Sequence, residues 1–293
     1  MGKRWRVIRR VWGSVILHYY LPIGVRMSRV ARWALTATTL VSGVAAAPAS
    51  AKIVEYPLNP SATPVAKAMA RDPKLVRRAV FSALPPSSKP VAVSTTPLAG
   101  FPTHGKSFAI LTTGNARRAD DPNNAGDTGS ESRGPSIRGA RDVVIMRVDL
   151  NVPKGANCLS YDFRFLSEEF PEFVKDIYND AFISELGISN WDASGKEDPV
   201  ITAPNNFAKD TKGNPIRVNA VGDATVTAGQ AKGTTYDGAT RRLRASTRVK
   251  PGLRRLYLSI FDQGDRMYDS AVFLDNLRTS KASSCQTGVR ASS

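Results

Sequence analysis

Acidic side chains gather in two stretches of this sequence, although the chain as a whole is strongly basic. The stretches are SEEFPEFVKDIYNDAF, residues 167–182, and FDQGDRMYDSAVFLDN, residues 261–276. Each lies between segments with strand-like patterns, so its carboxylates are expected near strand ends. Such positions supply carboxylates and carbonyls together, and calcium takes six to eight oxygen ligands. We therefore predict a calcium site, with these candidate ligands: Glu168, Glu169, Asp180, Asp262, Asp265, Asp269 and Asp275.

The same acids have a second interpretation, in which they cap turns and pair with nearby arginines such as Arg164 and Arg266. Asp275 is the most informative of them, because it lies between Leu274 and Asn276 inside an otherwise apolar strand. A carboxylate in such a place must be paired, hydrogen-bonded or bound to a metal. The sequence leaves both interpretations open.

The inventory of reactive side chains argues against an enzyme. His104 is the only histidine beyond the N-terminal segment, and neither H-E-x-x-H nor G-x-S-x-G occurs. Glu168 and Glu169 are neighbours on a strand, so they point to opposite faces and cannot act together on one glycosidic bond. We therefore expect no catalytic residues. One alternative stays open: Glu169 and Glu172 or Asp180 could converge in a hydrolase that acts on envelope polysaccharide.

The N-terminal segment is typical of export. From Met27 it has a basic start, an apolar stretch over 33–47 and Ala-Ser-Ala at 49–51. This is the layout of a secretory signal peptide, and the apolar stretch is short for a membrane span. We predict a signal peptide over 27–51 and a secreted chain without stable membrane insertion. Residues 1–26 are then a superfluous extension, unless 11–25 form a separate membrane-associating segment.

The charge that remains after this segment is moderate. Residues 1–51 hold eight basic side chains and no acid, so the net charge of +16 falls to +8 without them. The remaining Lys and Arg are scattered, with no basic stripe interleaved with aromatic residues, and we expect no nucleic-acid partner. Cys158 and Cys285 are the only cysteines. In an exported chain they most simply form one disulfide, the alternative being two buried thiols.

The pattern along the chain predicts a mainly β protein. Residues 52–105 read as a helix and linker region, with short helices beginning at Pro64, where Thr63 is the expected cap, and at Pro73. Residues 106–280 hold short apolar runs separated by turns, which indicates an antiparallel β-sandwich of the jelly-roll kind. One run places alternate residues on a single face: Val144, Met146, Val148, Leu150 and Val152. Residues 281–293 are expected to form a C-terminal tail.

Four motifs together resemble a known family. They are ILTTGNA at 110–116, SEEFPEFV at 167–174, NDAF at 179–182 and DQGDRMYDSAVFLDN at 262–276. This combination is similar to the choice-of-anchor L domain of secreted bacterial proteins. The resemblance implies an extracellular module and brings no catalytic residue with it. It departs from the family at Leu166 and Phe170, where Gly and Tyr are usual.

These observations lead to a functional expectation. We expect a secreted, surface-associated or adhesin-like β-sandwich module that binds an extracellular glycan or protein, stabilised by calcium. Trp191, Tyr178 and Tyr236 are candidates for a stacking surface. The C-terminal sequence KASSCQTGVRASS has no apolar tail or sorting motif, so we expect a released protein rather than an anchored one.

Overall fold

The structure is a computed structural model that describes residues 5–8, 11–12, 15–16, 19–22, 53–55, 61–86, 89–127, 133–195 and 201–292. The chain forms two units, residues 1–48 and 49–293. In the first unit, β1 (Trp5–Ile8) pairs with β4 (Tyr19–Pro22), and β2 (Val11–Trp12) pairs with β3 (Val15–Ile16), both antiparallel. The signal peptide predicted over 27–51 lies outside the described residues. No described helix is long and apolar enough to cross a membrane.

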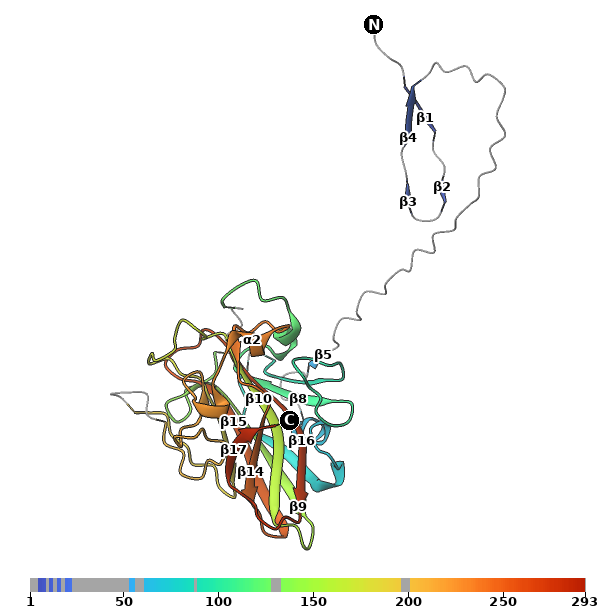
Figure 1. Ribbon diagram of the computed structural model, residues 1–293. Coiled ribbons are helices and arrows are strands. Elements are labelled where there is room, and N and C mark those ends of the chain that lie inside the picture. The colour runs from blue at the N-terminus through green and yellow to red at the C-terminus, as the bar shows by residue number, and fades with distance from the viewer. Residues whose placement is uncertain are drawn as a thin grey trace. The chain divides into compact units, whose positions relative to one another are not determined.

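The second unit contains two antiparallel sheets packed face to face (Figure 1). The larger sheet has the order β17-β14-β10-β16-β8-β7-β5, and β13 also pairs with β10. Its strands, in that order, are β17 (Gly288–Ala291), β14 (Leu243–Arg248), β10 (Cys158–Ser167), β16 (Ser270–Ser280), β8 (Phe108–Thr112), β7 (Val91–Ser94) and β5 (Ile53–Glu55), with β13 at Gly238–Ala239.

The smaller sheet has the order β12-β11-β15-β9-β6. Its strands, in that order, are β12 (Ile216–Arg217), β11 (Ala181–Leu186), β15 (Gly252–Asp262), β9 (Arg141–Val152) and β6 (Val76–Ala83). The short helices are α1 (Ala62–Ala68), η1 (Pro73–Leu75), η2 (Ala116–Asp120), η3 (Gly222–Ala224) and α2 (Ala228–Ala231). This arrangement confirms the predicted antiparallel β-sandwich with few short helices.

The main core lies between the sheets and follows the two-residue period of the strands. The alternate residues predicted along β9, from Val144 to Val152, are all buried there. Tyr161, Phe163 and Phe165 of β10 meet them from the larger sheet. Each sheet also buries residues on its outer face beneath loops, including Phe273 on the larger sheet and Phe261 on the smaller one.

The region before the sandwich is partly sheet rather than helix. α1 forms where a helix is expected, but Thr63 lies inside it, and its hydroxyl hydrogen-bonds the backbone of Ala79 instead of capping the helix. The second expected helix, from Pro73, is wrong: only η1 is helical, and the chain continues as β6. A register shift between Val76 and Arg78 in the β6–β9 pairing places buried Val76 and Ala79 three residues apart, which resembles a helical period.

The C-terminal segment is also more ordered than a tail. β17 adds an edge strand next to β14, so the sandwich extends beyond the boundary predicted at residue 280. The disulfide between Cys158 and Cys285 is present, with the Cα atoms 5.5 Å apart. It joins the start of β10 to the segment that leads into β17.

Candidate functional site

Four strand ends from both sheets meet at one end of the sandwich, and each carries an acid. Glu168 and Glu169 follow β10, and Asp269 precedes β16, both in the larger sheet. Asp180 precedes β11, and Asp262 ends β15, both in the smaller sheet. All five side chains are at most 3% exposed. The end of β10 also pairs with β13, which contacts α2, so the acidic cluster lies toward the α2 end of the sandwich (Figure 1).

Backbone amides connect the acids across the strand ends. Glu169 Oε2 accepts a hydrogen bond of 3.0 Å from the amide of Asp180, which joins the larger sheet to the smaller one. Asp180 Oδ1 accepts a bond of 3.3 Å from the amide of Gln263, just after β15. Glu168 Oε2 accepts a bond of 3.0 Å from the amide of Asp269. These bonds fix the strand ends, and they leave Oδ2 of Asp180 without a hydrogen bond.

Several oxygen atoms in this cluster are buried without a hydrogen bond. Neither Oδ1 nor Oδ2 of Asp262 accepts a hydrogen bond of normal geometry, although the side chain is fully buried. The same holds for Asp180 Oδ2 and for Gln263 Oε1. None of the ion pairs between described residues includes Glu169, Asp180 or Asp262. Buried charge without compensation is expensive, so the arrangement needs a proton or a cation.

The pKa values of these carboxyl groups are raised, as expected for buried acids without an ion pair among the described residues. Burial raises the pKa of Glu169 to about 8, and Asp265 and Asp176 add to the rise. Burial, followed by repulsion from Glu169 and Asp262, holds the pKa of Asp180 well above its usual range. Burial, followed by repulsion from Asp269, also raises the pKa of Asp262, and the Thr113 hydroxyl offsets part of that rise.

The ligand types in the cluster suit a hard cation. Carboxylate, amide and hydroxyl oxygens are what calcium binds, and no histidine or cysteine takes part. In the described part of the chain, no three acidic, histidine or cysteine side chains stand in the geometry of a completed metal site. A cation would therefore have to draw the side chains together as it binds.

Asp275 does not belong to this cluster. It lies six residues beyond Asp269 along β16, which is roughly 20 Å at the rise of a strand. Its Oδ2 accepts bonds from the amides of Thr103 and His104 at 2.5 and 2.7 Å. This predicted ligand is thus separated from the other acids, and the backbone of a loop supplies its hydrogen bonds.

Asp162 on β10 is the cross-strand neighbour of Asp275 and completes a second acidic network. Its carboxylate accepts 2.7 Å bonds from Arg244 Nε and 2.8 Å bonds from Asn276 Nδ2. Burial alone would raise the pKa of Asp162, but the bonds from Arg244 and Asn276 outweigh it and lower the pKa. We call these residues, with Thr103 and Asp275, the Asp162 network.

The two arginines expected to pair with acids of the cluster, Arg164 and Arg266, have other partners. Arg164 donates to Gln230, through Nη1 to the backbone oxygen and through Nη2 to Oε1. Arg266 pairs with Asp142, a fully buried acid at the start of β9 that the sequence reading missed. The predicted ligand Asp265 lies at the rim, where its Oδ1 accepts a bond from the amide of Met267. The predicted pairing of the clustered acids with Arg164 is therefore wrong.

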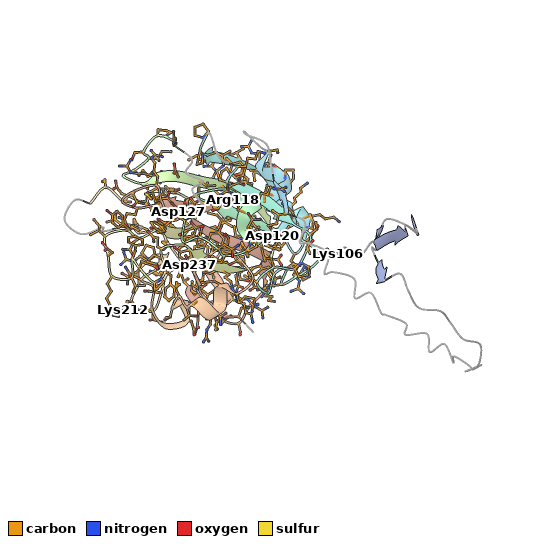
Figure 2. All side chains as sticks on the ribbon, turned by 90° about the horizontal axis from the view of Figure 1, so that it is seen from above. Lys106, Arg118, Asp120, Asp127, Lys212 and Asp237 are labelled. Carbon is orange, nitrogen blue, oxygen red and sulfur yellow. A yellow bond between two sulfur atoms is a disulfide. The ribbon has the colours of Figure 1, made fainter. Side chains whose placement is uncertain are left out.

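More acids surround this end on loops. Asp127 raises the pKa of Asp265, and Glu172 raises the pKa of Asp237, although burial is the larger cause in both cases. Figure 2, which is seen from above relative to Figure 1, labels Asp127 and Asp237. The acidic character thus extends from the buried cluster to the loops around it.

Aromatic side chains meet on the two loops that follow Glu169 and Asp262. Phe173 contacts Tyr178 and Tyr268, with ring centroids 5.5 and 4.8 Å apart. Trp191 and Tyr236, two of the three residues proposed for a stacking surface, are instead buried, and Trp191 stacks on Phe261 at 4.2 Å. Phe173 and Tyr268 were not predicted, although their positions in the two acidic stretches are a signal that sequence reading could have used.

Two surface hollows lie at the opposite end of the sandwich. One, of about 370 Å³, is lined by residues that include Arg71, Lys74 and Arg278. The other, of about 410 Å³, is lined by residues that include Arg248 and Lys250. Neither hollow contains an acid of the buried cluster.

Comparisons with known proteins give one family and two distant structures. No curated protein matches the chain. TmCBM61, solved in complex with β-1,4-galactotriose, is 12% identical, with 78% of this chain and 99% of that chain covered and a TM-score of 0.28. The enzymatically active domain of bacteriophage CBA120 tailspike protein 4 is 8% identical, with 77% of this chain and 22% of that chain covered and a TM-score of 0.25. Likenesses this low carry no argument about a ligand. Residues 99–278, more than half of the chain, match the choice-of-anchor L domain, and the chain therefore belongs to that family.

Proposed function

We propose that this chain is a secreted, non-catalytic binding module whose ligand contacts the loops over the acidic end of the sandwich. The observation that carries the proposal is an exposed apolar surface on these loops. Val174, Ile177 and Met267 are 38%, 56% and 46% exposed. They flank the half-buried rings of Phe173 and Tyr268. We call these five residues the loop-end surface.

The composition of the loop-end surface favours a polypeptide ligand over a glycan. Aromatic residues and methionine are enriched where proteins bind proteins, and exposed apolar patches often mark such sites. The Phe173 ring is contacted by two other rings, one at an interplanar angle of 84° and one at 56°. Such packing leaves little open ring face for a sugar to stack on.

The burial of the acids supports a non-catalytic role. A glycoside hydrolase needs two carboxyl groups that reach the scissile bond from either side. Glu169, which belongs to both pairs that could converge, is 1% exposed, and so is Asp180. Their hydrogen-bonded position between strand ends suits a structural role.

Three features support export: the family, the predicted signal peptide and the disulfide. The predicted signal peptide and the Cys158–Cys285 disulfide both fit an oxidising, extracellular compartment. The family itself occurs in secreted bacterial proteins.

A cell-binding assay tests the proposal. The full chain is produced with export, labelled, and titrated onto cells of the producing bacterium. Ile177→Lys is expected to weaken binding about tenfold or more, because a charge at the centre of an apolar contact must be desolvated. Ile188→Lys is the matched control: Ile188 is 67% exposed but follows the far end of β11, and its substitution should leave binding unchanged.

Treatment of the cells separates the ligand classes. Protease treatment should abolish binding, whereas periodate treatment should leave it intact. The reverse result identifies a glycan ligand. Equal binding by the two lysine variants would show that the loop-end surface is not the binding site, and release of reducing sugar ends by the wild-type protein would establish the hydrolase instead.

A further inference from the structure

The buried acidic cluster needs a positive charge that its protein neighbours do not supply. Asp262 is fully buried, and neither of its carboxylate oxygens accepts a hydrogen bond of normal geometry. Asp180 Oδ2 and Gln263 Oε1 are buried and unsatisfied as well. A native structure seldom leaves several acceptors of this kind together without a missing water or ion.

The acids of the cluster lie within electrostatic reach of one another. Glu169 and Asp262 both repel Asp180, and Asp269 repels Asp262. Backbone hydrogen bonds explain the convergence. The amide of Asp180 donates to Glu169 Oε2, and the amide of Gln263 donates to Asp180 Oδ1. The ends of β10, β11 and β15 that carry the three acids are therefore held together at this place.

We propose that the acidic cluster binds one calcium ion between the two sheets, with Glu169, Asp180 and Asp262 as its carboxylate ligands and Gln263 as an amide ligand. The set contains only oxygen donors, which calcium prefers, and it joins loops of both sheets, which suits calcium's variable coordination better than the rigid octahedron of magnesium. Asp275, one of the sequence-predicted ligands, is excluded because it belongs to the Asp162 network. The proposal does not depend on the binding function proposed above.

Bound calcium has a structural consequence. It would connect the end of β10, the start of β11 and the end of β15, the same elements that lead into loops 170–178 and 263–268. An ion that binds the folded state and not the unfolded state raises the melting temperature in proportion to ln(1 + [L]/Kd). At a hundredfold excess over Kd, the expected rise is about 5–10 °C for a domain of this size.

The test uses the full chain produced with export and stripped of metal. Melting is measured in chelator, in calcium chloride and in magnesium chloride at equal concentration. Calcium should raise the melting temperature by several degrees, and magnesium should do much less. Asp262→Asn should abolish the calcium response and should melt in chelator at or above the wild-type temperature, because it removes one repelling charge.

Asp275→Asn is the matched control, since it makes the same charge change at a carboxylate that is also buried, at 2% exposure against 0% for Asp262. It should keep the full calcium response. Equilibrium dialysis of the unmutated protein gives an independent readout, with one calcium per chain expected. Equal melting temperatures in chelator and calcium, or no calcium retained on dialysis, would overturn the proposal and indicate that the carboxyl groups share protons instead.

Discussion

The acidic cluster and the Asp162 network are built on the same two strands, and they differ in what balances their charge. Asp162 and Glu168 are six residues apart on β10 and its extension, and Asp269 and Asp275 are six apart on β16. In the Asp162 network, an arginine, an asparagine and two loop amides satisfy the carboxylates. In the acidic cluster, Glu169, Asp180 and Asp262 have no ion pair among the described residues, and the fully buried Asp262 accepts no side-chain hydrogen bond of normal geometry.

Buried carboxylates are therefore of two kinds, those with hydrogen-bond donors and those without them. A carboxylate that already has its donors is part of the scaffold, because a further ligand has no free oxygen to bind. A carboxylate that is equally buried but unsatisfied identifies a place where something else must supply the charge. Burial by itself does not separate the two, since Asp162 and Asp180 are 2% and 1% exposed.

The largest loss of stability is expected when Arg244, the positive charge of the Asp162 network, is replaced. Arg244→Met leaves Asp162 buried without its ion pair, and breaking such a pair costs about 3–5 kcal/mol. Denaturant unfolding in saturating calcium measures the loss. The double variant with Asp162→Asn should recover much of it, because no buried charge then remains. A loss below about 1 kcal/mol would contradict the view that Arg244 compensates Asp162.

A pH series in chelator should act on Glu169 and Asp162 in opposite directions. Burial raises the pKa of Glu169 to about 8, from a usual value of 4.5. The folded state therefore keeps protons that the unfolded state has released, and stability is lost as pH rises through that range. Asp162 has a lowered pKa, so its contribution is present above about pH 4 and is lost as pH falls further.

Urea unfolding between pH 5 and pH 8 checks this prediction, and the expected decrease is on the order of a few kcal/mol. Saturating calcium should remove most of the decrease, because a bound cation stabilises the ionised carboxylates. A stability that does not depend on pH in chelator would show that Glu169 is already compensated.

A smaller effect is expected from the loop that follows Asp262. Gly264 has φ +102°, and a Cβ atom there would lie 2.6 Å from Cδ1 of Tyr178. Gly264→Ala should therefore cost about 1–3 kcal/mol through backbone strain and should also weaken the response to calcium. Gly252→Ala is a useful control, since its φ is +96° but nothing lies within 4 Å of the added atom. Equal calcium responses in the two variants would argue against coupling between this loop and the cluster.

The smallest change in stability is expected from Asp265→Asn, at the rim of the cluster. The side chain of Asp265 is partly exposed. Burial therefore raises its pKa less than that of the fully buried Asp262. Asp265→Asn should change stability by less than about 0.5 kcal/mol and should keep most of the calcium shift. A calcium response lost in Asp265→Asn but kept in Asp262→Asn would move the proposed site to the rim.

The sequence by itself determined the fold class and showed the two acidic stretches that supply the cluster. The two-residue period of β9 and β10 showed which residues form the core, because a strand alternates its side chains between two faces. The two acidic stretches and the pair of cysteines were also visible as local patterns. The helix expected from Pro73 failed because irregular pairing with β9 imposes a burial pattern of three residues that a single segment cannot reveal.

The tertiary structure alone decided which acids meet and which are neutralised. Asp262 and Asp275 belong to one acidic stretch, yet they end in different environments, because an extended strand carries its residues apart by about 3.3 Å each. Arg244 and Thr103 reach Asp162 from sequence separations of 82 and 59 residues. Charge compensation over such separations depends on the pairing of strands from distant parts of the chain, and no local pattern records it.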